Sequence, residues 1–74
     1  MRMLKQVELE YDEVEALRLK NVEGLDQTSS AAKMGISQST FQRILDSANK
    51  KTSIALIEGQ AIKINLERKA NEKN

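Results

Sequence analysis

The residues of this chain best suited to chemistry lie on one side of a predicted helix, and their polar groups match the edges of DNA bases. They are Ser37, Gln38, Ser39, Gln42 and Arg43. An arginine can donate two hydrogen bonds to O6 and N7 of guanine, and a glutamine can pair with N6 and N7 of adenine. These side chains therefore predict a surface that reads the major groove of double-stranded DNA.

A second group of residues fits contact with phosphate, which gives affinity and salt dependence without sequence discrimination. It combines two hydroxyls at the start of the preceding helix with three ammonium groups: Thr28, Ser29, Lys33, Lys50 and Lys51. Residues 27–74 hold eight Lys/Arg against four Asp/Glu, whereas residues 1–26 hold four against seven. The net charge of +1 thus hides a basic half, in which the predicted DNA surface lies.

The spacing of residues 27–46 predicts the helix-turn-helix that would position these groups. Ala31 is small enough for the close approach of two crossing helices, and Gly35 allows the positive φ of a tight turn. Ser37 is a good N-cap for the second helix. Apolar residues then recur at helical spacing, at Phe41, Ile44, Leu45 and Ala48. We expect a helix over 27–34, capped by Asp26, and a helix over 38–58 that ends at Gly59.

The rest of the chain predicts one more helix and two short strands. Residues 4–11 alternate between apolar and polar side chains, which indicates a strand. Asp12 then resembles an N-cap with a capping box completed by Glu15, ahead of an apolar stripe at Val14, Leu17 and Val22. A second alternating segment, 62–66, follows Gly59. The expected fold is mainly α, a single domain over 1–66 with a flexible charged tail at 67–74. The strands should pair, either within one chain or between two.

The end of the long helix is apolar on several sides, because residues 54–57 read Ile, Ala, Leu and Ile. A single small core can bury only one of these sides. We therefore predict a homodimer whose interface includes Ile54, Ile57, Ile62 and Ile64.

Composition argues against several other classes of protein. The 74 residues include no cysteine and no histidine, so disulfides, thiolate metal sites and the commonest catalytic bases are missing. We expect no enzyme activity, no metal and no cofactor, and the sequence points to no particular small-molecule effector. A solvated, ion-paired surface is the expectation for Glu13, Glu15, Arg18 and Glu23. No apolar run reaches the roughly 18 residues of a membrane span, and no signal-peptide pattern is present, which favours the cytoplasm.

Several of these segments resemble one family along about residues 7–64. They are 12–19 (DEVEALRL), 23–25 (EGL), Ala31, 34–37 (MGIS), 40–45 (TFQRIL), 47–48 (SA) and 55–59 (ALIEG). The family is that of short bacterial and archaeal predicted DNA-binding proteins called domain of unknown function one-three-four, whose helices are similar to region four of sigma factors. The resemblance implies a helix-turn-helix regulator fold. The chain departs from it in lacking a basic, proline-containing start, and in having Asp26 and Ser30 where serine and alanine are usual.

Two hypotheses for function follow. The first is sequence-specific binding of double-stranded DNA by a homodimer that regulates transcription. The alternative is a protein-interaction adaptor with a sigma-like helix-turn-helix and little affinity for DNA, which the modest basic charge favours.

Overall fold

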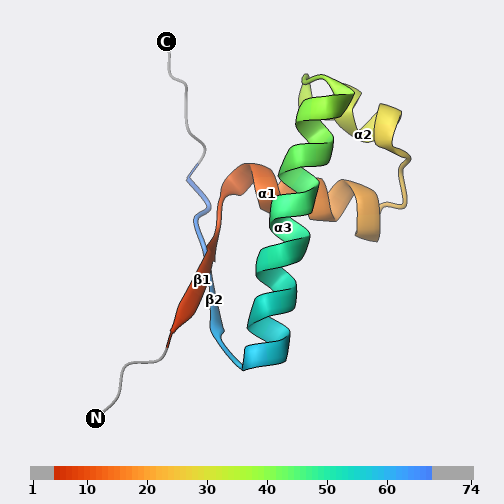
Figure 1. Ribbon diagram of the computed structural model, residues 1–74. Helices are drawn as coiled ribbons and strands as arrows, with labels where there is room; N and C mark the ends of the chain where they lie inside the picture. Colours follow the sequence, from red (N-terminus) through yellow and green to blue (C-terminus); the bar gives the residue numbers. More distant parts are fainter. Residues whose placement is uncertain (1–4, 68–74) are drawn as a thin grey trace.

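The computed structural model describes residues 5–67, which form a mainly helical fold flanked by two short strands (Figure 1). The elements in order are β1 (Gln6–Leu9), α1 (Tyr11–Leu17), a π-helical turn η1 (Arg18–Val22), α2 (Gln27–Met34), α3 (Gln38–Glu58) and β2 (Ala61–Ile64). The predicted fold class is confirmed, with α3 the longest helix. Of the predicted tail, residues 68–74 lie outside the described part of the chain.

The ends of α2 and α3 are fixed by short-range interactions, as the sequence predicted. Asp26 caps α2, because its carboxylate accepts a hydrogen bond from the backbone amide of Ser29 at 2.7 Å. The chain then reverses at Gly35, where φ is +70°. Ser37 caps α3 by accepting a hydrogen bond from the amide of Thr40 at 3.1 Å. Each cap satisfies one free amide at the start of its helix, and together with Gly35 the caps set where the helix-turn-helix begins and reverses.

The start of α1 differs from the prediction. Its N-cap is Glu10, whose amide donates a hydrogen bond to the Glu13 carboxylate at 2.8 Å. The predicted capping box of Asp12 and Glu15 is therefore wrong by two residues, and Tyr11 belongs to the helix rather than to the strand. The reason lies in the tertiary structure: Glu13 is also held by α3, whereas Asp12 is exposed in the first turn.

The buried side of the first helix also differs from the predicted stripe. Ala16 and Leu19 are buried, whereas Val22 is 79% exposed. Val22 ends the π-helical turn, just before the chain turns away at Gly24, so nothing in the described chain covers it. Val14 and Leu17 are half-buried.

The core lies where the three helices meet. Its buried cluster consists of Ala16, Ala31, Phe41 and Leu45, with Leu17, Met34, Ile36 and Ile44 packed against it. Ala31 is 2% exposed and Phe41 is fully buried, as expected from the spacing of the motif. The aromatic ring of α3 thus fills the angle between α1 and α2, which fixes how α3 projects from the domain.

The two strands pair with each other in parallel, alongside the C-terminal half of α3 (Figure 1). The register runs from Gln6 opposite Ala61 to Leu9 opposite Ile64. This pairing within one chain answers the question that the sequence left open. Leu9 is buried, and the Lys51 ammonium on α3 donates to the backbone carbonyl of Glu8 at 2.9 Å, so β1 is fastened to the long helix. None of the helices in residues 5–67 is both long and apolar enough to cross a membrane.

Candidate nucleic-acid interface

The predicted base-reading residues lie together in the cap and first turns of α3. Ser37, Gln38, Ser39 and Arg43 are exposed and Gln42 is half-buried. The hydroxyl of Ser37 is engaged in capping, and it also lies 3.3 Å from the hydroxyl of Ser39. Packing of Phe41 and Leu45 on the opposite side of the helix turns this polar side outward.

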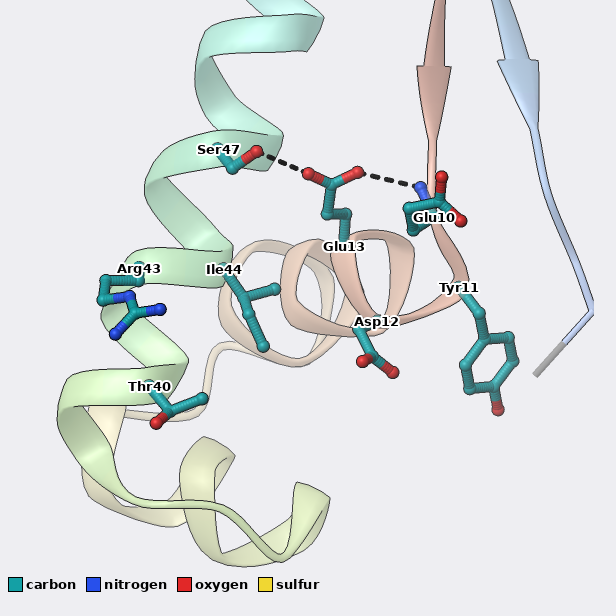
Figure 2. A pocket seen from close by; sticks show the side chains of 8 residues that line it. All are labelled: Glu10, Tyr11, Asp12, Glu13, Thr40, Arg43, Ile44 and Ser47. Carbon is teal, nitrogen blue, oxygen red and sulfur yellow. Dashed lines mark hydrogen bonds between the residues drawn. The ribbon is translucent and has the colours of Figure 1, made fainter. Parts of the chain in front are cut away.

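Arg43 carries the only positive charge among these five side chains. Within residues 5–67 its guanidinium makes no hydrogen bond or ion pair, and it borders a groove between α3 and the start of α1 (Figure 2). Asp12 and Glu10 lie along the other side of the groove. A guanidinium without a partner in its own chain keeps all its donors free for a ligand.

Gln42 is already oriented by a neighbour one helical turn on. Its side-chain amide donates to the carboxylate of Asp46 at 2.7 Å. Asp46 is thus paired with Gln42 and not with Arg43. This bond holds the amide group of Gln42 in one orientation and leaves its carbonyl oxygen available as an acceptor.

The residues predicted to contact phosphate differ in their exposure and in their bonding partners. Thr28 and Ser29 are exposed in the first turn of α2, but the amide of Ser29 already binds Asp26. That amide bond, together with the Ser29 hydroxyl, holds the pKa of Asp26 below its ordinary value. The carboxylate therefore stays ionised at neutral pH and opposes a phosphate at this helix end.

Among the predicted lysines, Lys33 and Lys50 are exposed, and Lys51 is bound within the fold. Lys50 follows Arg43 by about two turns of α3 and so shares its side of the helix. The Lys51 ammonium instead lies 3.0 Å from a carboxylate oxygen of Glu13. Its position indicates a structural role that the sequence did not reveal.

Glu13 is the one member of the predicted solvated surface that is buried. Arg18 pairs with Glu15 at 2.8 Å and with Glu23 at 3.1 Å, as expected. Glu13, however, is only 7% exposed, and it accepts a hydrogen bond from the Ser47 hydroxyl (Figure 2). Its partners Ser47 and Lys51 lie 34 and 38 positions along the chain, too far apart for any local pattern to predict the contact.

These contacts set the protonation state of Glu13. Burial by itself would raise the pKa of the carboxyl, but hydrogen bonds from Ser47, from the Glu10 amide and from Lys51 more than offset it. The pKa of Glu13 therefore lies below its ordinary value of 4.5. The ionised carboxylate joins the start of α1 to α3, and its partner Lys51 links this point to β1.

Of the predicted dimer residues, Ile54 and Ile57 lie near the end of α3, and Ile62 and Ile64 lie on β2, which runs parallel to β1 towards the start of α1. Ile57 is 82% exposed, Ile62 42% and Ile64 48%, while Ile54 is half-buried. Two further apolar residues are exposed here, Leu56 and Leu66. One long helix thus has a polar, cationic surface near its start and an apolar surface at its end.

Comparison with known sequences assigns this chain to a family. The model of the family described as protein of unknown function DUF134 matches residues 2–68. The chain belongs to the DUF134 family. The resemblance inferred from the sequence motifs is therefore confirmed. No solved structure matches the chain.

Several relatives in the family are named UPF0251 proteins. One from Clostridium botulinum strain Hall is 56% identical over 61 residues, which are 82% of this chain and 39% of the relative. One from Moorella thermoacetica is 50% identical over 64 residues, 86% of this chain and 43% of the relative. One from Desulforudis audaxviator is 54% identical over 61 residues, 82% of this chain and 40% of the relative. The chain spans about two fifths of the length of these relatives.

Proposed function

We propose that this chain binds double-stranded DNA in a sequence-specific manner, as a homodimer that regulates transcription. The observation that carries the proposal is the placement of Arg43. It lies on the exposed side of a capped helix, directly after a tight turn from α2, and has no partner within residues 5–67. A helix-turn-helix presents the start of its second helix to base edges in the major groove in this way.

Each exposed group on this side of α3 has a distinct role in the proposal. Arg43 donates two hydrogen bonds to guanine, because its planar fork matches O6 and N7. Gln38 is exposed at the first turn, and its side-chain amide reads adenine. Gln42 offers its carbonyl oxygen to a base amino group, while Asp46 fixes its amide end.

The charges around the helix define the side from which DNA approaches. The exposed ammonium group of Lys50 lies on the same side of α3 as Arg43, whereas Asp12 and Glu10 flank Arg43 at the start of α1. Lys33 lies on α2 and borders a second groove together with Asp12 and Glu15. A duplex that docks on the side of α3 with Arg43 and Lys50 avoids close contact with these carboxylates. Lys50 contacts phosphate in this arrangement, because it lies about two turns along α3 from Arg43.

One observation favours the alternative of a protein-interaction adaptor. The ionised Asp26 caps α2, the helix end at which such motifs meet the DNA backbone, and it opposes a phosphate there. A partner protein with a basic segment would tolerate this carboxylate, whereas DNA would bind more weakly.

Selection of binding sites from a pool of random duplexes tests the proposed function. The protein should enrich a palindrome whose half-sites are about one helical turn apart. Arg43→Ala, run in parallel, should lose the enrichment while its circular dichroism stays that of the folded protein. Failure of the folded wild-type protein to enrich any sequence at low salt would reject sequence-specific DNA binding and leave the adaptor.

A further inference from the structure

We propose that the second copy of this chain joins the first through the free edge of β2, with Ile64 on the two-fold axis. The two β2 strands run antiparallel and unite the two-stranded sheets into one sheet of four strands. This inference gives the geometry of the homodimer in the proposed function and rests on it for its biological use. It does not depend on DNA binding, and its test is independent.

The hydrogen bonds between the strands show which backbone groups of β2 are free. The amide of Ala61 donates to the carbonyl of Lys5 at 3.2 Å, and the amide of Asn65 donates to that of Leu9 at 2.9 Å. Backbone groups alternate in direction along a strand, so Lys63 also faces β1. Ile62, Ile64 and Leu66 therefore direct their amides and carbonyls away from β1. The sheet of the described chain has only two strands, so this edge is unpaired there.

The side chains along this edge are apolar and exposed. Ile62 is 42%, Ile64 48% and Leu66 72% exposed, and Ile57 at the nearby end of α3 is 82% exposed. Unpaired strand edges attract other strands, and natural proteins usually protect them with charge or proline. Residues 61–66 contain one charged residue, Lys63, and no proline. An edge that is both unpaired and apolar indicates a surface covered by another strand.

The sequence of β2 selects one antiparallel register with itself. With Ile64 opposite Ile64 of the second copy, Ile62 faces Leu66 and Lys63 faces Asn65. Every outward-facing residue of the edge then exchanges hydrogen bonds with an apolar residue, and no like charges meet. This self-complementarity is what an isologous two-fold interface requires.

The neighbouring registers of the two β2 strands are less favourable than the one with Ile64 on the axis. A shift that places Lys63 on the axis brings two ammonium groups opposite each other, which destabilises a strand pair. A shift that places Ile62 on the axis pairs Ile64 with Gln60, whose amide already donates to the carbonyl of Ala55 at 3.0 Å. A shift that places Asn65 on the axis leaves Ile62 without a partner among residues 61–66.

The occupant is a second copy of this chain because the edge of β2 is complementary to itself in the register with Ile64 on the axis. Two strands alone are marginal, whereas four that share an apolar side next to α3 bury that side more completely. Ile57 lies next to the new sheet, at about 21 Å along α3 from Arg43. Ile64 itself lies opposite Leu9, one residue before Glu10 on the groove that Arg43 borders, so the two-fold axis lies near the start of α1.

Single cysteines test the register, because the natural chain contains no cysteine. In Ile64→Cys the two Cα atoms would face each other at about 5.5 Å, within the range of a disulfide. In Lys63→Cys they would be diagonal, at about 7–8 Å. Under mild oxidation we expect Ile64→Cys to form a disulfide-linked dimer on the order of tenfold faster than Lys63→Cys, a difference that urea should abolish.

The outcomes separate this inference from the proposed function. Faster linkage of Lys63→Cys would overturn the register with Ile64 on the axis. In sedimentation equilibrium at micromolar concentration, the wild type should have about twice its monomer mass of 8.3 kDa. A mass equal to that of the monomer would overturn the interface. A monomer that still enriches a single short DNA site would reject only the dimer. A dimer linked through Ile64→Cys that enriches no DNA would support the interface and reject the proposed function.

Discussion

The hydroxyl of Ser47 on α3 donates a hydrogen bond to the carboxylate of Glu13 on α1, and this bond fastens the first helix to the long one. The same carboxylate binds Lys51, one turn further along α3. Ser47 also follows Arg43 by about one turn, so the fastening point is close to the predicted DNA surface (Figure 2). The orientation of α3 relative to the rest of the domain thus depends on a buried carboxylate.

Replacing this carboxylate should destabilise the fold. Glu13→Gln keeps the shape of the side chain but removes the charge that binds Ser47 and Lys51, at a cost of about 1.5–3 kcal/mol in the free energy of unfolding. We expect the midpoint of thermal unfolding to fall by roughly 10 °C. The control is Glu23→Gln, whose ion pair with Arg18 is half-exposed and worth less than about 1 kcal/mol. Equal losses in the two variants would contradict the role of Glu13.

The stability of the fold should also depend on pH through Glu13. Because its pKa is lower in the folded state than its ordinary value of 4.5, the group stabilises the fold above about pH 4.5 and loses this effect as pH falls through the folded pKa. Asp26 acts in the same direction. Urea unfolding between pH 7 and pH 3 should show a shallower loss of stability for Glu13→Gln than for the wild type. Parallel curves for the two proteins would rule out this contribution.

Arg43 should discriminate between DNA sequences. Arg43→Ala should cost about 1–3 kcal/mol on the selected site and much less on random duplex. Arg43→Lys keeps the charge but loses the planar fork, so it should retain affinity for random DNA and lose most of the preference. Fluorescence anisotropy with both duplexes measures these affinities. Equal weakening on the two duplexes would exclude base reading by Arg43.

Lys50 should act through charge alone. Lys50→Ala should weaken all duplexes alike and reduce the slope of log affinity against log salt by about one unit. Lys51→Ala should leave the slope nearly unchanged and lower the stability, because its ammonium binds Glu13 and the Glu8 carbonyl. Titrations at several salt concentrations compare the two variants. A larger change of slope for Lys51 would reverse these roles.

The turn of the helix-turn-helix should require glycine. Gly35 has φ +70°, and a Cβ built there would meet nothing within 4 Å, so the cost of a side chain comes from backbone conformation alone. Gly35→Ala should destabilise the protein by about 1–2 kcal/mol. Gly35→Asn should cost less, because asparagine adopts positive φ more readily. Chemical unfolding of both variants provides the comparison, and an alanine variant as stable as the wild type would contradict it.

The parts of the fold that the sequence predicted correctly are those encoded by neighbouring residues. Asp26, Gly35, Ser37 and Gly59 each act within a few positions of themselves, and the bounds of α2 and α3 follow from them. The exposed placement of Arg43 likewise follows from the spacing of Phe41 and Leu45 on the same helix.

The parts that the sequence did not predict depend on residues far apart in the chain. Glu10 rather than Asp12 caps α1 because Glu13 is drawn to Ser47 and Lys51 on α3. The exposure of Val22 depends on which residues pack against the end of the first helix. The spacing of apolar residues along that helix gives no information about these contacts. The sequence could not distinguish parallel pairing within one chain from pairing between chains. Alternation of apolar and polar residues shows which side of a strand is buried, but not which strand it pairs with.

The parallel pairing of β1 with β2 also determines the order in which this protein can form. Of the described elements β1 is synthesised first and β2 last, so the three helices exist before the sheet can close. Strand pairs this distant in sequence form slowly, because a long loop must be closed before any contact between them is made. On a ribosome, therefore, the helix-turn-helix can fold before the free edge of β2 exists. In the proposed dimer, two nascent chains would associate only after each one has completed its own sheet.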